Sequence, residues 1–136
     1  MDLSTLTLFI FSSSLLLFSC AAGENEKSIE EIAKEIDQLI GNAEAESIDQ
    51  CALMPIGSKP AGGPWGFLVY SKEYTDQEKL ENLVEKYNEL DAARNEESGG
   101  FSTADVATEP QIAIRNGSCF GEGMYAWNPG EVESKM

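Results

Sequence analysis

The sequence predicts a small α+β domain, in which two amphipathic helices pack on an antiparallel sheet of three to four strands and one disulfide is present. Two stretches carry apolar residues at helical spacing, and several short stretches rich in branched or aromatic residues lie between turn residues. Two cysteines far apart in the chain supply the disulfide. The length of 136 residues allows one domain. We expect this domain at residues 28–130, followed by a flexible tail at 131–136.

The first predicted helix begins at Ser28. Ser28 and Glu31 have the spacing of a capping box. The apolar residues that follow recur at intervals of three and four, as expected for one buried helical face: Ile29, Ile32, Ile36, Leu39 and Ile40. Gly41 and Asn42 end the helix.

Two strands and a rigid loop follow this helix. Residues 49–56 predict a short strand that stops at Pro55 and Gly57. Residues 57–64 contain three glycines and two prolines, which excludes helix and central strand there. Residues 65–71 carry aromatic and branched side chains on both faces, which is typical of a central strand covered on both sides.

The second predicted helix begins with another capping-box pattern, formed by Thr75 and Glu78. It extends to about Arg94, and a polar loop is expected at residues 95–102. One face of the helix is apolar and consists of Leu80, Leu83, Val84, Tyr87 and Leu90.

The C-terminal third predicts a hairpin and a last edge strand. Residues 111–115 and 118–120 alternate around Asn116-Gly117, the dipeptide most typical of a two-residue hairpin turn. Residues 124–127 predict the edge strand, before Asn128-Pro129-Gly130 ends the regular structure.

The N-terminal residues have the pattern of an export signal. Residues 3–18 are apolar or hydroxylic without a charge, end in small residues, and are shorter than the roughly 20 residues that span a bilayer. Leu17-Phe18-Ser19-Cys20 resembles the lipobox of bacterial lipoproteins. The resemblance implies that residues 1–19 are a signal peptide, that Cys20 carries lipid, and that residues 20–27 form a tether. The alternative is ordinary cleavage near Ala21 or Ala22 of a secreted protein.

The cysteine count fits an exported protein. If Cys20 is spent on lipid, Cys51 and Cys119 remain, and an oxidising compartment would pair them. A bridge closing so long a loop stabilises by up to roughly 4 kcal/mol in the chain-entropy model. If Cys20 is retained as a thiol, one of three cysteines stays unpaired. In a secreted eukaryotic protein Asn116-Gly117-Ser118 would be a glycosylation sequon.

Charge and composition exclude several functional classes. The chain has 9 Lys and Arg residues against 24 Asp and Glu residues, a formal net charge of −15 and an isoelectric point near 4.1. We expect no nucleic-acid partner, because counterion release requires a basic surface. The absence of histidine removes Ser-His-Asp and Cys-His nucleophile pairs and His-ligated zinc sites. We therefore expect no enzyme activity, no cofactor and no metal site.

The stretch 59–71 reads KPAGGPWGFLVYS and, with Thr75-Asp76 and residues 116–119, resembles a group of small exported bacterial proteins and lipoproteins of unknown function. Their loop reads KPCGGP and their strand ends in LVYS. The similarity covers roughly residues 48–121, and it implies export and this architecture without naming an activity. Ala61 stands in place of the loop cysteine, and small residues around Ala104 stand where a second cysteine often lies. The resemblance thus implies that this bridge was lost as a unit and that Cys51–Cys119 is the bridge that remained.

Two surfaces are candidates for binding. The amides of Gly62 and Gly63 beside Lys59 can form an anion-binding nest with Trp65 at its edge, or the loop is a rigid turn. Four glutamates share one face of the second helix and can meet a basic partner or weakly hold Ca²⁺, or they form a solvated face. These are Glu78, Glu81, Glu85 and Glu89.

Two functions follow from these observations. The first is an exported, lipid-anchored cell-envelope protein that acts as a non-catalytic binding or structural module for an unknown protein or envelope component. The second is a diffusible secreted inhibitor or toxin-like factor that inserts the loop at residues 57–65 into a partner.

Overall fold

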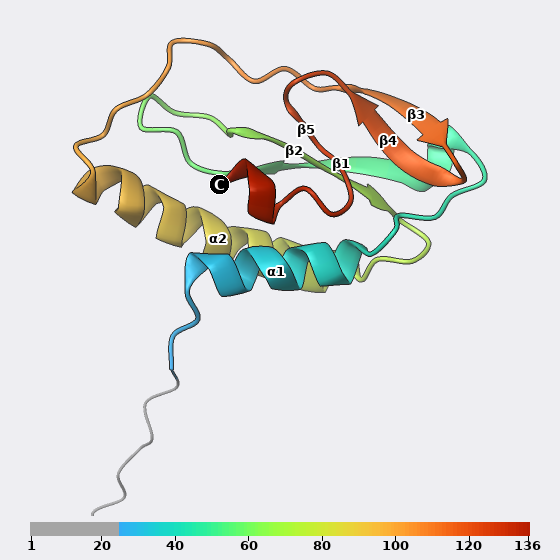
Figure 1. Cartoon of the computed structure of the whole chain (residues 1–136), viewed down its shortest axis with the longest axis horizontal. Helices are drawn as coiled ribbons and strands as arrows, with labels where there is room; N and C mark the ends of the chain where they lie inside the picture. Colours follow the sequence, from blue (N-terminus) through green and yellow to red (C-terminus); the bar gives the residue numbers. More distant parts are fainter. Residues whose placement is uncertain (1–24) are drawn as a thin grey trace, which may run out of the picture.

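Three layers make up the part of the chain that the computed structural model describes, residues 25–136 (Figure 1). Two helices form one outer layer, a three-stranded sheet lies in the middle, and a two-stranded hairpin forms the other outer layer. The α+β class and its two helices are therefore confirmed. The strands, however, form two separate sheets, where the sequence predicted one.

Helix α1 (Ile29–Ile40) has the ends that its sequence predicts. The Ser28 hydroxyl accepts from the Glu31 amide, the Glu31 carboxylate accepts from the Ser28 amide, and Gly41 ends the helix with a φ of 57°. The buried face consists of Ile29, Ile32, Ala33, Ile36 and Ile40.

Helix α2 (Gln77–Glu97) has its N-cap one residue later than predicted and ends three residues beyond Arg94. The N-cap is Asp76, whose carboxylate accepts from the Lys79 amide at 3.1 Å. Thr75 is 7% exposed, and its hydroxyl has no hydrogen-bond partner. The capping box predicted from Thr75 and Glu78 is therefore wrong: the aspartate supplies both an acceptor and a negative charge at the positive end of the helix dipole.

The middle sheet has the strand order β1-β2-β5. A short 3₁₀ turn (Ile48–Gln50) precedes β1 (Cys51–Ile56), so this strand begins two residues later than expected. β2 (Gly66–Ser71) lies between its neighbours and all six of its residues are buried, as predicted for a central strand. β1 and β2 are antiparallel, with Cys51 opposite Ser71.

β5 (Ala126–Trp127) pairs with β2 in parallel, which corrects the prediction of a wholly antiparallel sheet. The connection from β2 to β5 contains α2 and the hairpin, which is long enough for the crossover that parallel pairing requires (Figure 1). Gly66 permits this approach, because a Cβ atom there would lie 2.2 Å from the indole nitrogen of Trp127.

The hairpin β3 (Gln111–Arg115) and β4 (Ser118–Glu122) confirms the predicted turn. Asn116 and Gly117 have φ angles of 52° and 75°, which suit a two-residue hairpin connection. β4 packs over β2 at Gly121, where a Cβ atom would approach Val69 Cγ2 to 2.8 Å.

Residues 131–136, the segment predicted as a flexible tail, place one side chain in the core. Val132 is fully buried, and a 3₁₀ turn (Glu133–Lys135) follows it. The Asp37 carboxylate of α1 accepts from the Val132 and Glu133 amides at 3.2 Å each. The two hydrogen bonds connect this segment to α1 (Figure 1).

The predicted signal peptide, Cys20 and most of the predicted tether lie outside the described residues. Between residues 25 and 136, neither helix combines the length and the apolar composition needed to cross a membrane.

Candidate functional site

The loop at residues 57–64 is fixed at its base by helix α2. The Asn88 side-chain oxygen accepts from the Gly57 amide at 2.7 Å, and the Asn95 side-chain nitrogen donates to the Ser58 carbonyl at 2.7 Å. Asp91 lies between these two residues on the same face of the helix. A rigid element therefore positions the start of the loop.

Asp91 is a buried carboxylate at the centre of this contact. It is 1% exposed and accepts from the Ser58 amide at 2.8 Å and from the Trp65 indole nitrogen at 2.9 Å. Arg94 forms an ion pair with its other oxygen at 2.9 Å. A buried carboxylate requires such partners. The Ser58 amide at the base of the loop thus binds an anion, which is a side chain of this same protein.

The glycines of the loop tip close a tight turn. The Lys59 amide donates to the Gly63 carbonyl at 3.0 Å, and the Gly62 amide donates to the Lys59 carbonyl at 2.9 Å. Gly62 and Gly63 have φ angles of 97° and 84°, which favour glycine. The geometry supports the rigid-turn interpretation, because the amides of Lys59 and Gly62 are occupied within the loop.

Lys59 points inward and is held by neighbouring groups. Its side chain is 4% exposed, and Nζ donates to the Asp105 carbonyl at 2.6 Å. The same Nζ lies 3.6 Å from the Asp105 carboxylate and 5.2 Å from the centre of the Trp65 ring. Of the four predicted loop residues, Lys59 and Trp65 are therefore engaged in internal contacts.

Asp105 connects this loop to the segment before β3. Hydrogen bonds from Thr103 and Tyr125, aided by the charge of Lys59, lower the pKa of Asp105 to about 2. The Tyr125 hydroxyl donates to the carboxylate at 2.7 Å, and this bond raises the pKa of Tyr125. The loop containing Ala61 and the segment near Ala104 are thus neighbours, joined here through Lys59 and Asp105.

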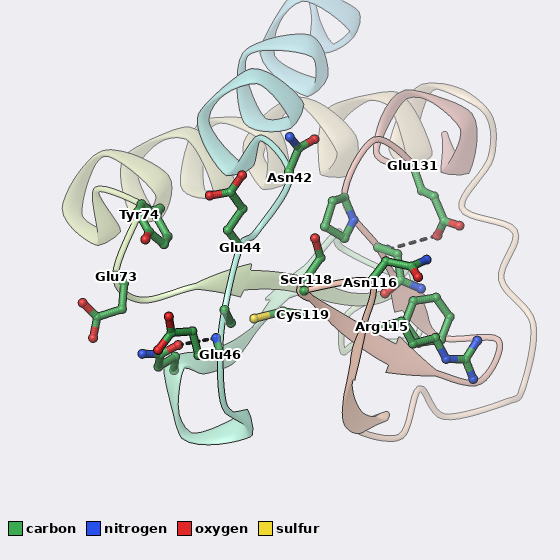
Figure 2. A pocket seen from close by; sticks show the side chains of 16 residues that line it. Asn42, Glu44, Glu46, Glu73, Tyr74, Arg115, Asn116, Ser118, Cys119 and Glu131 are labelled. Carbon is green, nitrogen blue, oxygen red and sulfur yellow. Dashed lines mark hydrogen bonds between the residues drawn. The ribbon is translucent and has the colours of Figure 1, made fainter.

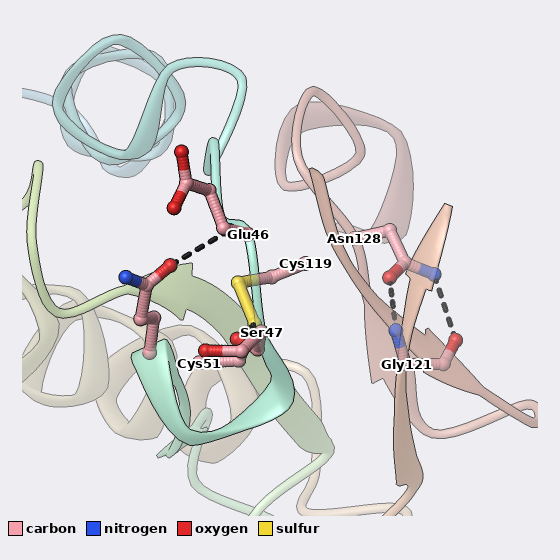
Figure 3. The surroundings of a disulfide bond; sticks show 7 residues. Glu46, Ser47, Cys51, Cys119, Gly121 and Asn128 are labelled. Carbon is pink, nitrogen blue, oxygen red and sulfur yellow. Dashed lines mark hydrogen bonds between the residues drawn. A yellow bond between two sulfur atoms is a disulfide. The ribbon is translucent and has the colours of Figure 1, made fainter. Parts of the chain in front are cut away.

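The predicted disulfide is confirmed. Cys51 in β1 and Cys119 in β4 are bonded, with a Cα–Cα distance of 5.7 Å, so the bridge joins the middle sheet to the hairpin (Figure 3). Two residues further along β4, the Asn128 side chain accepts from the Gly121 amide at 2.7 Å and donates to the Gly121 carbonyl at 3.1 Å (Figure 3).

A polar groove of about 980 Å³ lies beside the disulfide. Figure 2 shows carboxylates around it, together with Tyr74 and Arg115. Arg115 is engaged by Glu122 at 2.9 Å and lies 4.0 Å from the centre of the Phe120 ring. The acidic residues that line the groove are Glu44, Glu46, Glu73 and Glu131. Such a groove favours cationic groups over anionic ones.

A second groove, of about 530 Å³, lies between α2 and β1. Its apolar residues are Met54, Val84 and Ala92. Three exposed carboxylates of the predicted acidic stripe also line it, those of Glu81, Glu85 and Glu89. Glu78, the fourth member of the stripe, is exposed away from the groove.

The carboxylates of this groove repel one another. None of the three is in an ion pair within the described part of the chain, although Gln77 donates a hydrogen bond to Glu81 at 3.1 Å. Like charges four residues apart destabilise a helix by about 0.2–0.5 kcal/mol per pair. The helix therefore keeps two unfavourable pairs beside an apolar surface.

Sequence reasoning missed Asp91, Asn88 and Asn95, although one signal was present. Leu80, Val84, Tyr87 and Asp91 follow one another at spacings of four, three and four, and all four are buried. A carboxylate in line with an apolar stripe indicates an internal partner, because an unpaired buried charge is costly. Which donors it meets depends on the loop, which is remote in sequence.

Among residues 25–136 no group of three His, Cys, Asp or Glu side chains is placed to hold a metal ion. In comparisons with known proteins, no family, no curated protein and no solved structure matches this chain.

Proposed function

We propose that the protein is exported, carries lipid at Cys20, and acts at the cell envelope as a non-catalytic binding module. The Cys51–Cys119 disulfide carries this proposal. Structural disulfides of this kind persist in oxidising compartments outside the cytoplasm. Cys20 is then the one cysteine left over, in a sequence context that resembles a lipidation site.

The described surface supports a binding role. Two grooves are lined by carboxylates, and four of the nine cationic residues of the chain form ion pairs with its own carboxylates. The partner is therefore a protein or envelope component with cationic groups. Residues 20–28 span at most about 30 Å when extended, which would keep the domain close to the membrane.

The intact mass of the protein from its own host tests this proposal. We expect a chain that begins at Cys20 with added acyl mass, and a gain of two hydrogens on reduction. A chain that begins near Ala22 or Gly23 without lipid, or one with sugar at Asn116, would contradict the anchored function.

A diffusible inhibitor or toxin-like factor is the second candidate, and the loop at residues 57–65 favours it in one respect. The tip residues Pro60 and Ala61 are exposed on a base that α2 fixes, and such pre-organisation lowers the entropic cost of binding. Because Lys59 and Trp65 face inward, Ala61→Arg at the tip is the informative substitution. If the protein is an inhibitor that inserts this loop, the variant should no longer bind its target. If it is an anchored module that binds elsewhere, the variant should bind its partner as before.

A further inference from the structure

Strand β1 leaves its outer edge open, next to the groove formed with α2. It is the terminal strand of the sheet, and no strand within residues 25–136 pairs with that edge. In an antiparallel pair of strands, residues that bond to the partner strand alternate with residues that direct their main-chain groups away from it. The Lys72 amide donates to the Gln50 carbonyl, so every second residue from Gln50 onward bonds to β2. Leu53 and Pro55 therefore direct their main-chain groups outward.

Pro55 limits what can pair with this edge. Proline has no N–H group, so Leu53 supplies the one free donor of this part of the strand, together with carbonyl acceptors. An edge interrupted in this way discourages uncontrolled strand pairing between copies. It still allows a short extended segment to bond at Leu53, provided that its side chains find further contacts.

The groove offers such contacts of two kinds. Met54 projects from β1 on the face toward α2, where it lies beside Val84 and gives an apolar floor. Along the rim, Glu81, Glu85 and Glu89 repeat every four residues with no cationic partner in the described chain. The groove beside the disulfide, by comparison, is lined mainly by polar side chains.

We propose that the groove between α2 and β1 binds an extended cationic segment of a partner protein. Apolar side chains of the segment rest on Met54 and Val84, while its lysines or arginines meet the carboxylates of Glu81, Glu85 and Glu89. Charge complementarity selects this occupant, because a second copy of this chain carries the same net charge of −15. The inference deepens the binding role proposed above and does not require the lipid anchor.

The test uses the whole protein purified from its host, in detergent and at low salt, with fluorescent synthetic peptides. The probe alternates lysine and valine, and two control peptides alternate glutamate with valine and lysine with serine. We expect the lysine–valine peptide to bind most tightly, with an affinity that falls as salt is added.

The triple variant Glu81→Gln, Glu85→Gln and Glu89→Gln removes the rim charges. We expect it to bind the lysine–valine peptide about tenfold more weakly or worse. Its melting temperature should be unchanged or higher, because the like-charge repulsion along α2 is relieved. Lost binding without lost stability separates a binding role from a structural one.

A matched control removes the same number of charges elsewhere. Glu30→Gln, Glu97→Gln and Glu133→Gln replace three exposed glutamates outside the groove, and we expect the affinity of this variant to stay close to that of the unsubstituted protein. Met54→Ala, by contrast, should lower the affinity for the lysine–valine peptide more than the affinity for the lysine–serine peptide.

Several results would overturn the inference. Equal losses in the two triple variants, or equal affinity for the lysine–valine and lysine–serine peptides, would indicate general attraction to an acidic protein. Displacement of the peptide by Ca²⁺ alone would indicate that the groove is a cation site. Displacement of the peptide as the protein self-associates would indicate that a second copy of the chain occupies the groove. A protein without lipid that still binds the peptide would keep this inference and contradict only the anchored function.

Discussion

At the scale of single residues, Asp91 is the group on which the loop at residues 57–64 depends most. It accepts from the Ser58 amide, the Trp65 indole and the Arg94 guanidinium while it is 1% exposed. Removing the acceptor of a buried donor lowers the free energy of unfolding by more than the net contribution of the hydrogen bond, because no water replaces the lost partner. The loop conformation is therefore coupled to one side chain of α2.

We expect Asp91→Ala to lower the free energy of unfolding by at least about 2 kcal/mol, since two part-buried donors lose their acceptor at about 1–3 kcal/mol each. Asp91→Asn retains an acceptor oxygen at the same place and should cost less. Urea denaturation measures both variants. Equal effects of the two substitutions would show that the acceptor does not hold the loop.

Asp105 predicts a dependence of stability on pH. Its pKa is lowered from 3.8 to about 2 in the folded protein, by hydrogen bonds from Thr103 and Tyr125 and by the charge of Lys59. A lowered pKa in the folded state stabilises the fold above pH 3.8, and this contribution is lost as the pH falls through about 2. Unfolding of Asp105→Asn should therefore depend less steeply on pH between these values. Identical profiles for the variant and the unsubstituted protein would contradict this coupling.

At the scale of elements, the start of α2 shows how burial determines which of two neighbouring residues is the N-cap. Thr75 and Asp76 both have the chemistry of an N-cap. Thr75 lies in the core with an unpaired hydroxyl, and Asp76 is exposed and accepts from the Lys79 amide. The helix therefore begins where the capping side chain can remain at the surface.

Two substitutions distinguish these roles. Asp76→Ala should destabilise the protein by about 1 kcal/mol, the usual cost of removing an N-cap. Thr75→Val, which replaces an unpaired buried hydroxyl by a methyl group, should be neutral or stabilising. Thermal unfolding of both variants is the measurement, and a larger loss with Thr75→Val would restore threonine as the cap.

At the scale of the whole molecule, the three layers share one hydrophobic core, and specific long-range contacts reinforce it. The disulfide joins the middle sheet to the hairpin, and the carboxylate of Asp37 joins α1 to the C-terminal residues. Gly121 lets the hairpin approach the middle sheet closely, and Gly66 does the same for β2 and β5 within that sheet. A domain of this size is only marginally stable, so each of these contacts contributes a noticeable part of its stability.

Loss of the disulfide should therefore lower the free energy of unfolding substantially. We expect the double variant Cys51→Ala and Cys119→Ala to lose about 2–4 kcal/mol of unfolding free energy, chiefly because the unfolded chain gains conformational freedom. Urea denaturation of the unsubstituted protein with a reductant should show a similar loss. Full stability after verified reduction would mean that the layers are held by packing alone.

Much of the local structure could be predicted from the sequence, because the signals involved lie close together in the chain. The capping box at Ser28, the buried strand β2 and the turn at Asn116-Gly117 each depend on a few consecutive residues. The pairing of Cys51 with Cys119 was also predictable, since Cys20 was assigned to lipid. Periodicity, turn chemistry and cysteine count are properties of the chain itself.

Only the tertiary structure decided how these pieces meet. The parallel docking of β5 on β2, the separation of the hairpin as its own layer and the burial of Val132 depend on residues far apart in sequence. The same holds for the candidate sites: the loop predicted as an anion nest meets Asp91 of α2, and the acidic stripe becomes the rim of a groove only beside Met54 of β1. The physical reason is that burial and electrostatic pairing depend on which segments become neighbours, and sequence patterns report the chemistry of each segment without its neighbours.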